Sequence, residues 1–271
     1  MNGLTRNGIT VRLTRVILTA LTVAACAPSV RPSGYAPKWH VGDWWVVMTW
    51  QRYSPFCDWG SQYTRYDVTC IEKVGQQDCF VVETRSQGAD DWLAGNKNVL
   101  YVRTDNWFVV RRVWVRTNKD TLCPPDTLEC PLGLLGPSGG GEPRLPRFPL
   151  VPGDPDTAFR LQRRGGYSAK LREISRAADP AMVERWLDEG DSACGRVVRP
   201  TGVVYLVRNE VGGDIEPRHA PHDRRVAQSL QLWSSDLPWR PYEELALNYG
   251  SDYGWLAAER SWLIAVGHSG E

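Results

Sequence analysis

The sequence lacks the signatures of the common catalytic and metal-binding classes. It has four histidines and seven cysteines, and no Cys-x-x-Cys pair, so the ligand spacing of a thiolate zinc site is missing. The glycines at 139–141 are not followed by the Gly-Lys-Ser/Thr that completes a phosphate-binding loop. We therefore expect no catalytic residues, no cofactor and no metal ion, and we predict that the protein is not an enzyme.

Three local patterns partly match the motifs of enzymes or metal sites, and each lacks a feature that the motif requires. Ser192 lies in a Gly-Asp-Ser segment similar to that of trypsin-like proteases, but the only earlier histidine is His40 and a serine needs a base to become a nucleophile. His219 and His222 lie among prolines and arginines, which favours a solvated loop over a cation site. Adjacent acids such as Glu243 and Glu244 point to opposite faces of a strand, so a hydrolase is the less favoured alternative.

The chain also lacks a strong net charge and a long apolar run. Residues 1–25 contain three of the 32 basic residues and none of the 31 acidic ones, so the chain without them is formally slightly acidic. Nothing in this balance attracts nucleic acid. The apolar run at 16–25 is about half of the roughly twenty residues that a membrane-spanning helix needs.

The N-terminal segment has the features of an export signal. Arg6, Arg12 and Arg15 precede the apolar run, as in the charged region of a signal peptide. Its end, Val23-Ala24-Ala25-Cys26, resembles the lipobox of bacterial lipoproteins. The resemblance implies that residues 1–25 are a signal peptide and that Cys26 carries the lipid, palmitate included. The alternative is an ordinary signal peptide with Cys26 as a free or disulfide-bonded cysteine.

The same resemblance implies a cellular location. Members of the lipoprotein family tend to carry Asp after the cysteine when they stay in the inner membrane, and this chain has Ala27. We therefore expect an exported protein, anchored by its lipid to the periplasmic face of the outer membrane if the cell has two membranes. Residues 26–38 hold Pro28, Pro32 and Pro37 and are predicted to form an extended tether.

The remaining six cysteines suit a compartment where disulfides persist. Cys123 and Cys130 bound a short loop and form the first candidate pair. Cys70 and Cys79 flank a predicted hairpin turn and form the second, which leaves Cys57 with Cys194. Fifteen connectivities remain open for six cysteines.

The body of the chain is predicted to be mainly β, with a curved antiparallel sheet or half-open barrel. Alternating apolar residues indicate a first β half at 39–117 and a second at 157–271. Nine prolines and three consecutive glycines make 118–156 an irregular connection. A short helix is expected at 179–189, because an Asp, a Pro and a terminal Gly bound it.

A Gly-Asp step introduces each predicted half, at Gly42-Asp43 and Gly153-Asp154. This arrangement resembles uncharacterised secreted β-rich envelope proteins of bacteria. The resemblance implies two related β halves, which form either one domain or two.

Tryptophan is the most unusual component, with thirteen residues. Their simplest role is to fill the interior of a large sheet. Trp44, Trp45 and Trp50 are also candidates for ligand binding. Aromatic side chains in a cleft would suit a lipid or other hydrophobic ligand, while exposed rings would suit a cell-wall glycan. We therefore predict a membrane-anchored envelope lipoprotein with a structural or binding role, whose protein partner the sequence does not indicate.

Overall fold

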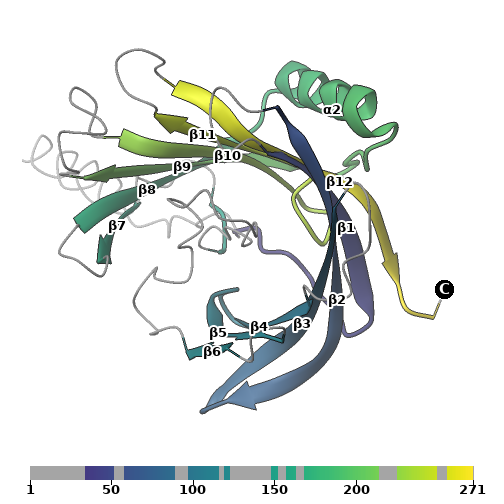
Figure 1. Cartoon of the computed structure of the whole chain (residues 1–271), viewed down its shortest axis with the longest axis vertical. Coiled ribbons are helices and arrows are strands. Elements are labelled where there is room, and N and C mark those ends of the chain that lie inside the picture. The colour runs from purple at the N-terminus through teal and green to yellow at the C-terminus, as the bar shows by residue number, and fades with distance from the viewer. Residues whose placement is uncertain are drawn as a thin grey trace, which may run out of the picture. The chain divides into compact units, whose positions relative to one another are not determined.

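The structure is a computed structural model that describes residues 34–51, 58–88, 97–115, 119–122, 148–151, 157–162, 168–213, 225–248 and 255–270. The folded unit spans Gly34–Glu271 (Figure 1). Residues 34–38, which the sequence analysis assigned to the tether, therefore lie within the folded unit. In the described ranges no helix has the length and apolar character needed to cross a membrane.

One sheet of twelve strands forms the unit, and every neighbouring pair is antiparallel. The strands of the first half are β1 (Asp43–Gln51), β2 (Gly60–Val74), β3 (Gln77–Gly88), β4 (Lys97–Arg103), β5 (Val109–Trp114) and β6 (Lys119–Leu122). Those of the second half are β7 (Thr157–Gln162), β8 (Ser168–Ala177), β9 (Val204–Gly213), β10 (Arg225–Ser234), β11 (Tyr242–Asn248) and β12 (Trp255–His268).

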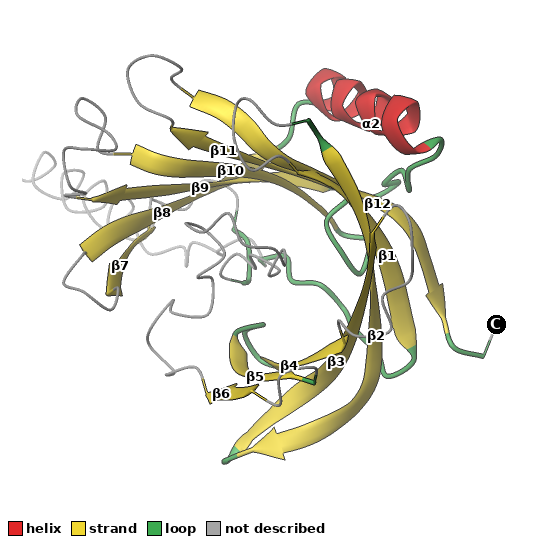
Figure 2. Ribbon diagram, in the orientation of Figure 1, coloured by secondary structure: helices red, strands yellow, loops and turns green. Residues whose placement is uncertain are grey.

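Each half is a series of strands paired in chain order, and the two halves join where β1 pairs with β12. The sheet is strongly curved, with α2 (Pro180–Cys194) on its convex side (Figure 2). β6 and β7 are its two edge strands, and no pairing joins them in the ranges that the structure describes. The predicted mainly β fold with an antiparallel, open sheet is confirmed, and the two halves belong to one sheet.

Both faces of β1 are covered, because alternate residues of a strand point to opposite sides. Met48 and Trp50 face α2 and belong to the convex-side core. Trp45 and Val47 face the concave side, where Trp45 has no exposed surface. The sequence suggests that the face with Trp44, Met48 and Trp50 is the apolar one. The structure shows that the mixed face supplies the more deeply buried indole.

Segments without regular structure fill one end of the concave face. Tyr35 and Leu150 exchange two backbone hydrogen bonds of 2.8 and 2.6 Å. Trp39 is 6% exposed, and its Nε1 donates to the Pro238 carbonyl at 2.6 Å. Trp239 then packs against Trp39, Trp45, Tyr66 and Trp233, with ring centroids 5.2–6.1 Å apart. This end of the concave face is therefore an aromatic core closed by the chain itself.

Helix α2 begins where the sequence predicts and ends later. Asp179 is its N-cap and accepts from the Ala181 amide at 3.1 Å. The predicted end at 189 is wrong, because the helix continues to Cys194 and the left-handed Gly195, at φ 84°, terminates it. Gly190 lies inside the helix, where an added Cβ would come within 2.4 Å of the Trp262 ring, so the position requires glycine. The glycine thus permits close packing on β12 and does not end the helix.

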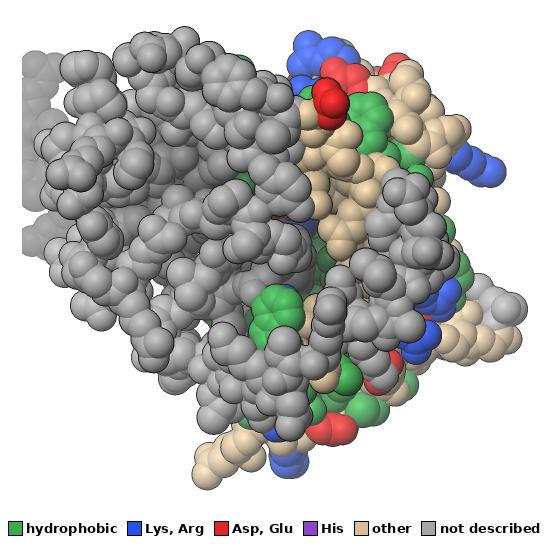
Figure 3. Space-filling model, viewed as in Figure 1, with side chains coloured by type: hydrophobic (Ala, Val, Ile, Leu, Met, Phe, Trp, Pro, Cys, Tyr) green, Lys and Arg blue, Asp and Glu red, His purple; other side chains and the backbone are tan. Residues whose placement is uncertain are grey.

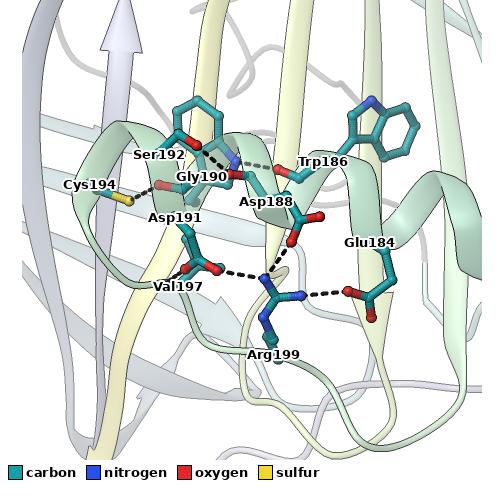
Figure 4. A network of polar contacts seen from close by, with 10 residues as sticks. Glu184, Trp186, Asp188, Gly190, Asp191, Ser192, Cys194, Val197 and Arg199 are labelled. Carbon is teal, nitrogen blue, oxygen red and sulfur yellow. Dashed lines mark hydrogen bonds and ion pairs between the residues drawn. The ribbon is translucent and has the colours of Figure 1, made fainter.

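An ion network on the outer surface ties α2 to the segment that follows it (Figure 4). Arg199 contacts the carboxylates of Glu184 at 2.6 Å, Asp188 at 2.7 Å and Asp191 at 2.5 Å. The Asp191 side chain also accepts from the Val197 amide at 2.8 Å. Hydrogen bonds from Arg199 and Val197 lower the pKa of Asp191. Because the network is exposed to solvent, we assign it a modest role in orienting the helix.

The predicted connection at 118–156 is partly structured. Lys119–Leu122 forms β6, so the prediction that no strand lies within this range is wrong. Phe148 and Leu150 are buried in the concave core. Local proline content could not indicate this, because the segment gains its structure from contacts with residues distant in sequence. Residues 123–147 lie outside the described ranges.

Asp236 anchors the loop that carries Trp239, and we expect this anchor to weaken in acid. Its carboxylate accepts from the Thr201 amide and hydroxyl, both at 2.6 Å, and from the Ser234 hydroxyl. Partial burial opposes ionisation, but hydrogen bonds from Ser234, Thr201 and Gly202 outweigh it and lower the pKa of Asp236 to about 2. The stabilisation is complete above the ordinary carboxyl pKa and is lost as pH falls toward 2.

Urea denaturation between pH 5 and pH 2 tests this expectation. The free energy of unfolding should fall more steeply with acid in the wild type than in Asp236→Asn, whose amide does not titrate. Equal slopes for the two proteins would contradict the assignment.

Candidate functional site

A row of partly accessible polar side chains crosses the concave face beside the aromatic core. We call it the polar ribbon. Its members come from six neighbouring strands, from β12 through β1 to β5, and each is half-buried. They are Glu259, Thr49, Gln51, Gln62, Thr64, Ser86, Asn98 and Trp114.

Strand register places these side chains on one face. Gln51 pairs with Glu259 on β12, and Thr49 pairs with Gln62 on β2. Thr64 pairs with Ser86 on β3, which brings the ribbon one strand further. Residues directly opposite in an antiparallel pair share a face. The residues paired with Thr49 and Gln51 therefore also face the concave side, and so do the residues paired with those in turn.

The ribbon is completed on the far side of β3. Thr84 pairs with Asn98 of β4, and Asn98 pairs with Trp114 of β5. Thr84 lies on the concave face because it is opposite Tyr66, a member of the concave core. The register therefore extends the same face to the end of the first half.

Hydrogen bonds between strands hold the ribbon side chains in place. The Thr64 and Ser86 hydroxyls are 3.1 Å apart, and those of Thr49 and Ser261 are 3.2 Å apart. Hydroxyl groups can donate and accept at once, so a side chain in such a pair retains capacity for another partner. The ribbon thus presents both hydrogen-bond donors and hydrogen-bond acceptors in fixed positions.

A cation and a phenol border the ribbon. The Arg112 guanidinium lies 3.5 Å from the centroid of the Trp114 ring. Burial lowers the pKa of Arg112 to about 10, which leaves it protonated at neutral pH. Burial also raises the pKa of Tyr66 to about 12; Arg240 opposes this shift, while Glu243 and Glu259 add to it. Tyr66 therefore stays a neutral hydroxyl next to charged groups.

A buried ion pair lies beside the ribbon on the concave face, because Glu243 is opposite Ser261 and Ser261 is opposite Thr49. Glu243 is 1% exposed, and its carboxylate contacts Arg240 at 2.5 Å and accepts from Gln231 Nε2 at 2.8 Å. The Gln231 oxygen in turn accepts from Trp233 Nε1 at 3.0 Å. The Arg240 guanidinium balances the charge of the buried carboxylate, so the pair does not present a net charge to the site.

The three tryptophans predicted to bind a ligand do not form one site. Trp45 is fully buried in the aromatic core. Trp44 lies on the other face, where the Arg65 guanidinium is 4.5 Å from its ring centroid. Trp50 packs between Trp59 and Trp262 on the convex side. Their adjacency in sequence therefore does not translate into a shared surface.

Two of the three predicted disulfides, Cys70 with Cys79 and Cys57 with Cys194, are not formed in the structure, and the third, Cys123 with Cys130, lies outside the described residues. Cys70, Cys79 and Cys194 are free thiols. Cys79 is opposite Glu72, and Cys70 is opposite Val81, so the two cysteines are diagonal neighbours on paired strands. Diagonal positions are about 7–8 Å apart, which exceeds the reach of an unstrained disulfide. The remaining cysteines of the prediction, Cys26, Cys57, Cys123 and Cys130, lie outside the described residues.

The other chemical candidates can be placed only in part. The Ser192 hydroxyl donates to the Asp188 carbonyl at 3.0 Å within α2 (Figure 4). His219 and His222 lie outside the described ranges. Within those ranges, no group of three or more metal-ligating side chains is arranged to hold an ion.

No protein-family model matches this chain, and no curated protein is significantly similar to it in sequence. The chain has a weak structural likeness to a protein from Bacteroides fragilis NCTC 9343, described as exported and as having a YmcC-like fold. The two share 10% sequence identity over 86% of this chain and 99% of the other, with a TM-score of 0.36. No property of this chain follows from a likeness of that size.

The chemistry of the concave face therefore has to be inferred from its own residues. The ribbon combines hydroxyls, carboxamides, one carboxylate and one indole, with a guanidinium at its border. Such groups bind a polar, uncharged molecule through hydrogen bonds and ring contact. The tryptophan pattern in the sequence does not indicate these residues, because they lie on strands that come together only in the folded sheet. The alternation of Thr49 and Gln51 with Trp50 was the available signal.

Proposed function

We propose that the protein is an exported, lipid-anchored envelope protein that binds a glycan on its concave face. The polar ribbon is the observation that carries the binding proposal. Sugars present hydroxyl groups in rings with apolar faces, and the ribbon offers donors, acceptors and the Trp114 indole to match them. Neither a catalytic step nor a cofactor is part of the proposal.

The ribbon favours a glycan over the hydrophobic ligand that the sequence also suggested. An acyl chain requires an apolar lining, and the apolar end of the concave face is occupied by Trp39, Phe148 and Trp239. Phe148 contacts Trp233 with ring centroids 4.9 Å apart, so these side chains pack against one another. Among the described residues, the partly accessible side chains that lie away from this aromatic core, along the ribbon, are mostly polar.

The export signal and the lipobox-like segment support the proposed location of the protein in the cell envelope. An anchor at Cys26 would keep the glycan-binding body at a membrane surface, eight residues before the folded unit begins at Gly34. A Cys26→Ser variant should lose palmitate labelling and leave the membrane fraction. Cys194→Ser, which removes a thiol from α2, should keep both properties. Continued labelling of the Cys26→Ser protein would refute the anchor.

A variant of two ribbon residues tests glycan binding. Thr64→Val with Ser86→Ala removes both members of one hydrogen-bonded pair, and such a double replacement by similar shapes costs little stability. We expect affinity for a bound glycan to fall about tenfold, since each lost hydrogen bond contributes about 0.5–1.5 kcal/mol. Isothermal titration calorimetry against soluble cell-wall and capsular polysaccharides measures the change.

The matched control removes two hydroxyls away from the concave face. Thr104→Val with Ser192→Ala affects hydroxyls that bond the Asp78 and Asp188 carbonyls. This control should bind the glycan as the wild type does. If the wild type binds no glycan in the panel, the proposed function is wrong.

A further inference from the structure

The length and direction of the polar ribbon restrict the kind of glycan. Its first residue, Glu259, is on β12 and its last, Trp114, is on β5. Five strand spacings of about 4.8 Å separate these strands, which gives a ribbon about 24 Å long. A pyranose unit is about as long as one strand spacing, so a single sugar could contact only a small part of the ribbon.

The ribbon runs across the strands and not along them. Thr64 and Ser86 of the ribbon are hydrogen-bonded across neighbouring strands, and Thr49 is hydrogen-bonded in the same way to the buried Ser261. Each strand therefore contributes one or two polar side chains at successive steps. A ligand with a repeat close to the strand spacing can contact a ribbon side chain at every step.

The open sheet leaves the last strand of the ribbon near an edge. Among the described strands, β6 alone follows β5 on that side, and β6 is an edge strand. The ribbon thus begins in the middle of the sheet and ends one strand from its border (Figure 1). An arrangement of this kind accommodates a ligand that extends past the protein.

Among the described residues, the ribbon and its border carry one charge of each sign. Glu259 is its one carboxylate, and Arg112 beside Trp114 supplies one positive charge at the other end. Glu243, beside the ribbon, is paired with Arg240. Figure 3 shows both acidic and basic side chains among the described residues visible from this side. Uncharged sugars fit this balance better than a polymer with one charge per unit.

From these observations we infer that the ligand is a linear, uncharged glycan that lies across the strands and fills about five sugar positions. The inference rests on the proposed glycan binding and makes it more specific. It distinguishes a polymer segment from a monosaccharide, from a chain end, and from an acidic polysaccharide.

A length series tests the inference. Malto-, cello- and chito-oligosaccharides of one to eight units are titrated into the protein by calorimetry, with uronic acid oligomers of the same lengths alongside. For at least one uncharged series, affinity should rise with each unit to about five or six and then level off. A disaccharide as tight as a pentasaccharide would overturn the linear-chain inference and leave glycan binding intact. Tighter binding of the uronic acid series would overturn the uncharged assignment.

Variants at the two ends locate the chain. Asn98→Ala, on β4, should weaken a pentasaccharide severalfold and leave a disaccharide bound at the β12 end unchanged. Glu259→Gln, at the β12 end, should weaken the binding of both the pentasaccharide and the disaccharide. Equal effects of both variants at every length would contradict an extended chain. Absence of binding by every oligosaccharide and polysaccharide would instead refute the proposed function itself.

Discussion

Trp239→Ala should lower the free energy of unfolding by about 3–5 kcal/mol, the usual cost of truncating a buried Phe or Trp. Trp239 is 2% exposed and belongs to a loop, yet its ring contacts four other aromatic rings. Truncation of Trp239 leaves a cavity between aromatic side chains that come from distant parts of the sequence. Urea denaturation followed by circular dichroism gives the change.

Trp59→Ala is the matched control for this prediction. Its side chain is 39% exposed, and it lies next to Trp50 on the other face of the sheet. We expect a loss below about 1 kcal/mol, because a partly exposed ring gives up less buried area. Similar losses for the two variants would contradict the assignment of Trp239 to a structural core.

The prediction depends on a core that local sequence patterns describe incompletely. Period-two alternation correctly predicts β1 and the opposite orientations of Trp44 and Trp45. It cannot indicate which face is covered by a distant segment. Trp39 and Phe148 reach the concave face from irregular segments on either side of the first half, so the deeper core lies on the face that looks less apolar.

Strand register limited the prediction of the site and of the disulfides in the same way. Thr49 and Gln51 are visible in the sequence as polar residues on one face of β1. Their neighbours Gln62 and Glu259 are known only once β2 and β12 are paired in a defined register. The same dependence explains why Cys70 and Cys79 flank a turn without facing each other.

The helix shows how one residue type can serve two purposes. A glycine at the end of an amphipathic stretch usually indicates a C-terminus. Gly190 is instead required for close contact with Trp262 and Val197, while Gly195 provides the terminating conformation. The sequence contains both glycines, and only the packing against β12 distinguishes their roles.

Arg240→Met should also lower the free energy of unfolding by about 3–5 kcal/mol, because it removes the ion-pair partner of a carboxylate that is buried. Glu243 is 1% exposed and Arg240 is 7% exposed. The Arg240 guanidinium also lies 4.8 Å from the Trp239 ring centroid, so the methionine keeps part of the packing but not the charge. Thermal and urea denaturation measure the loss.

A double-mutant cycle separates the charge from the packing. In Glu243→Gln with Arg240→Met both charges are absent, and the introduced carboxamide can still accept the hydrogen bond that Gln231 donates. The double variant should therefore be more stable than Arg240→Met alone, since an uncharged buried side chain needs no counter-ion. If the free energy of unfolding of Arg240→Met is within about 1 kcal/mol of the wild-type value, water reaches Glu243 and the ion pair is not needed to stabilise a buried charge. A large loss that the second substitution relieves would instead show that Glu243 is charged and buried, and that Arg240 is the counter-ion that stabilises it.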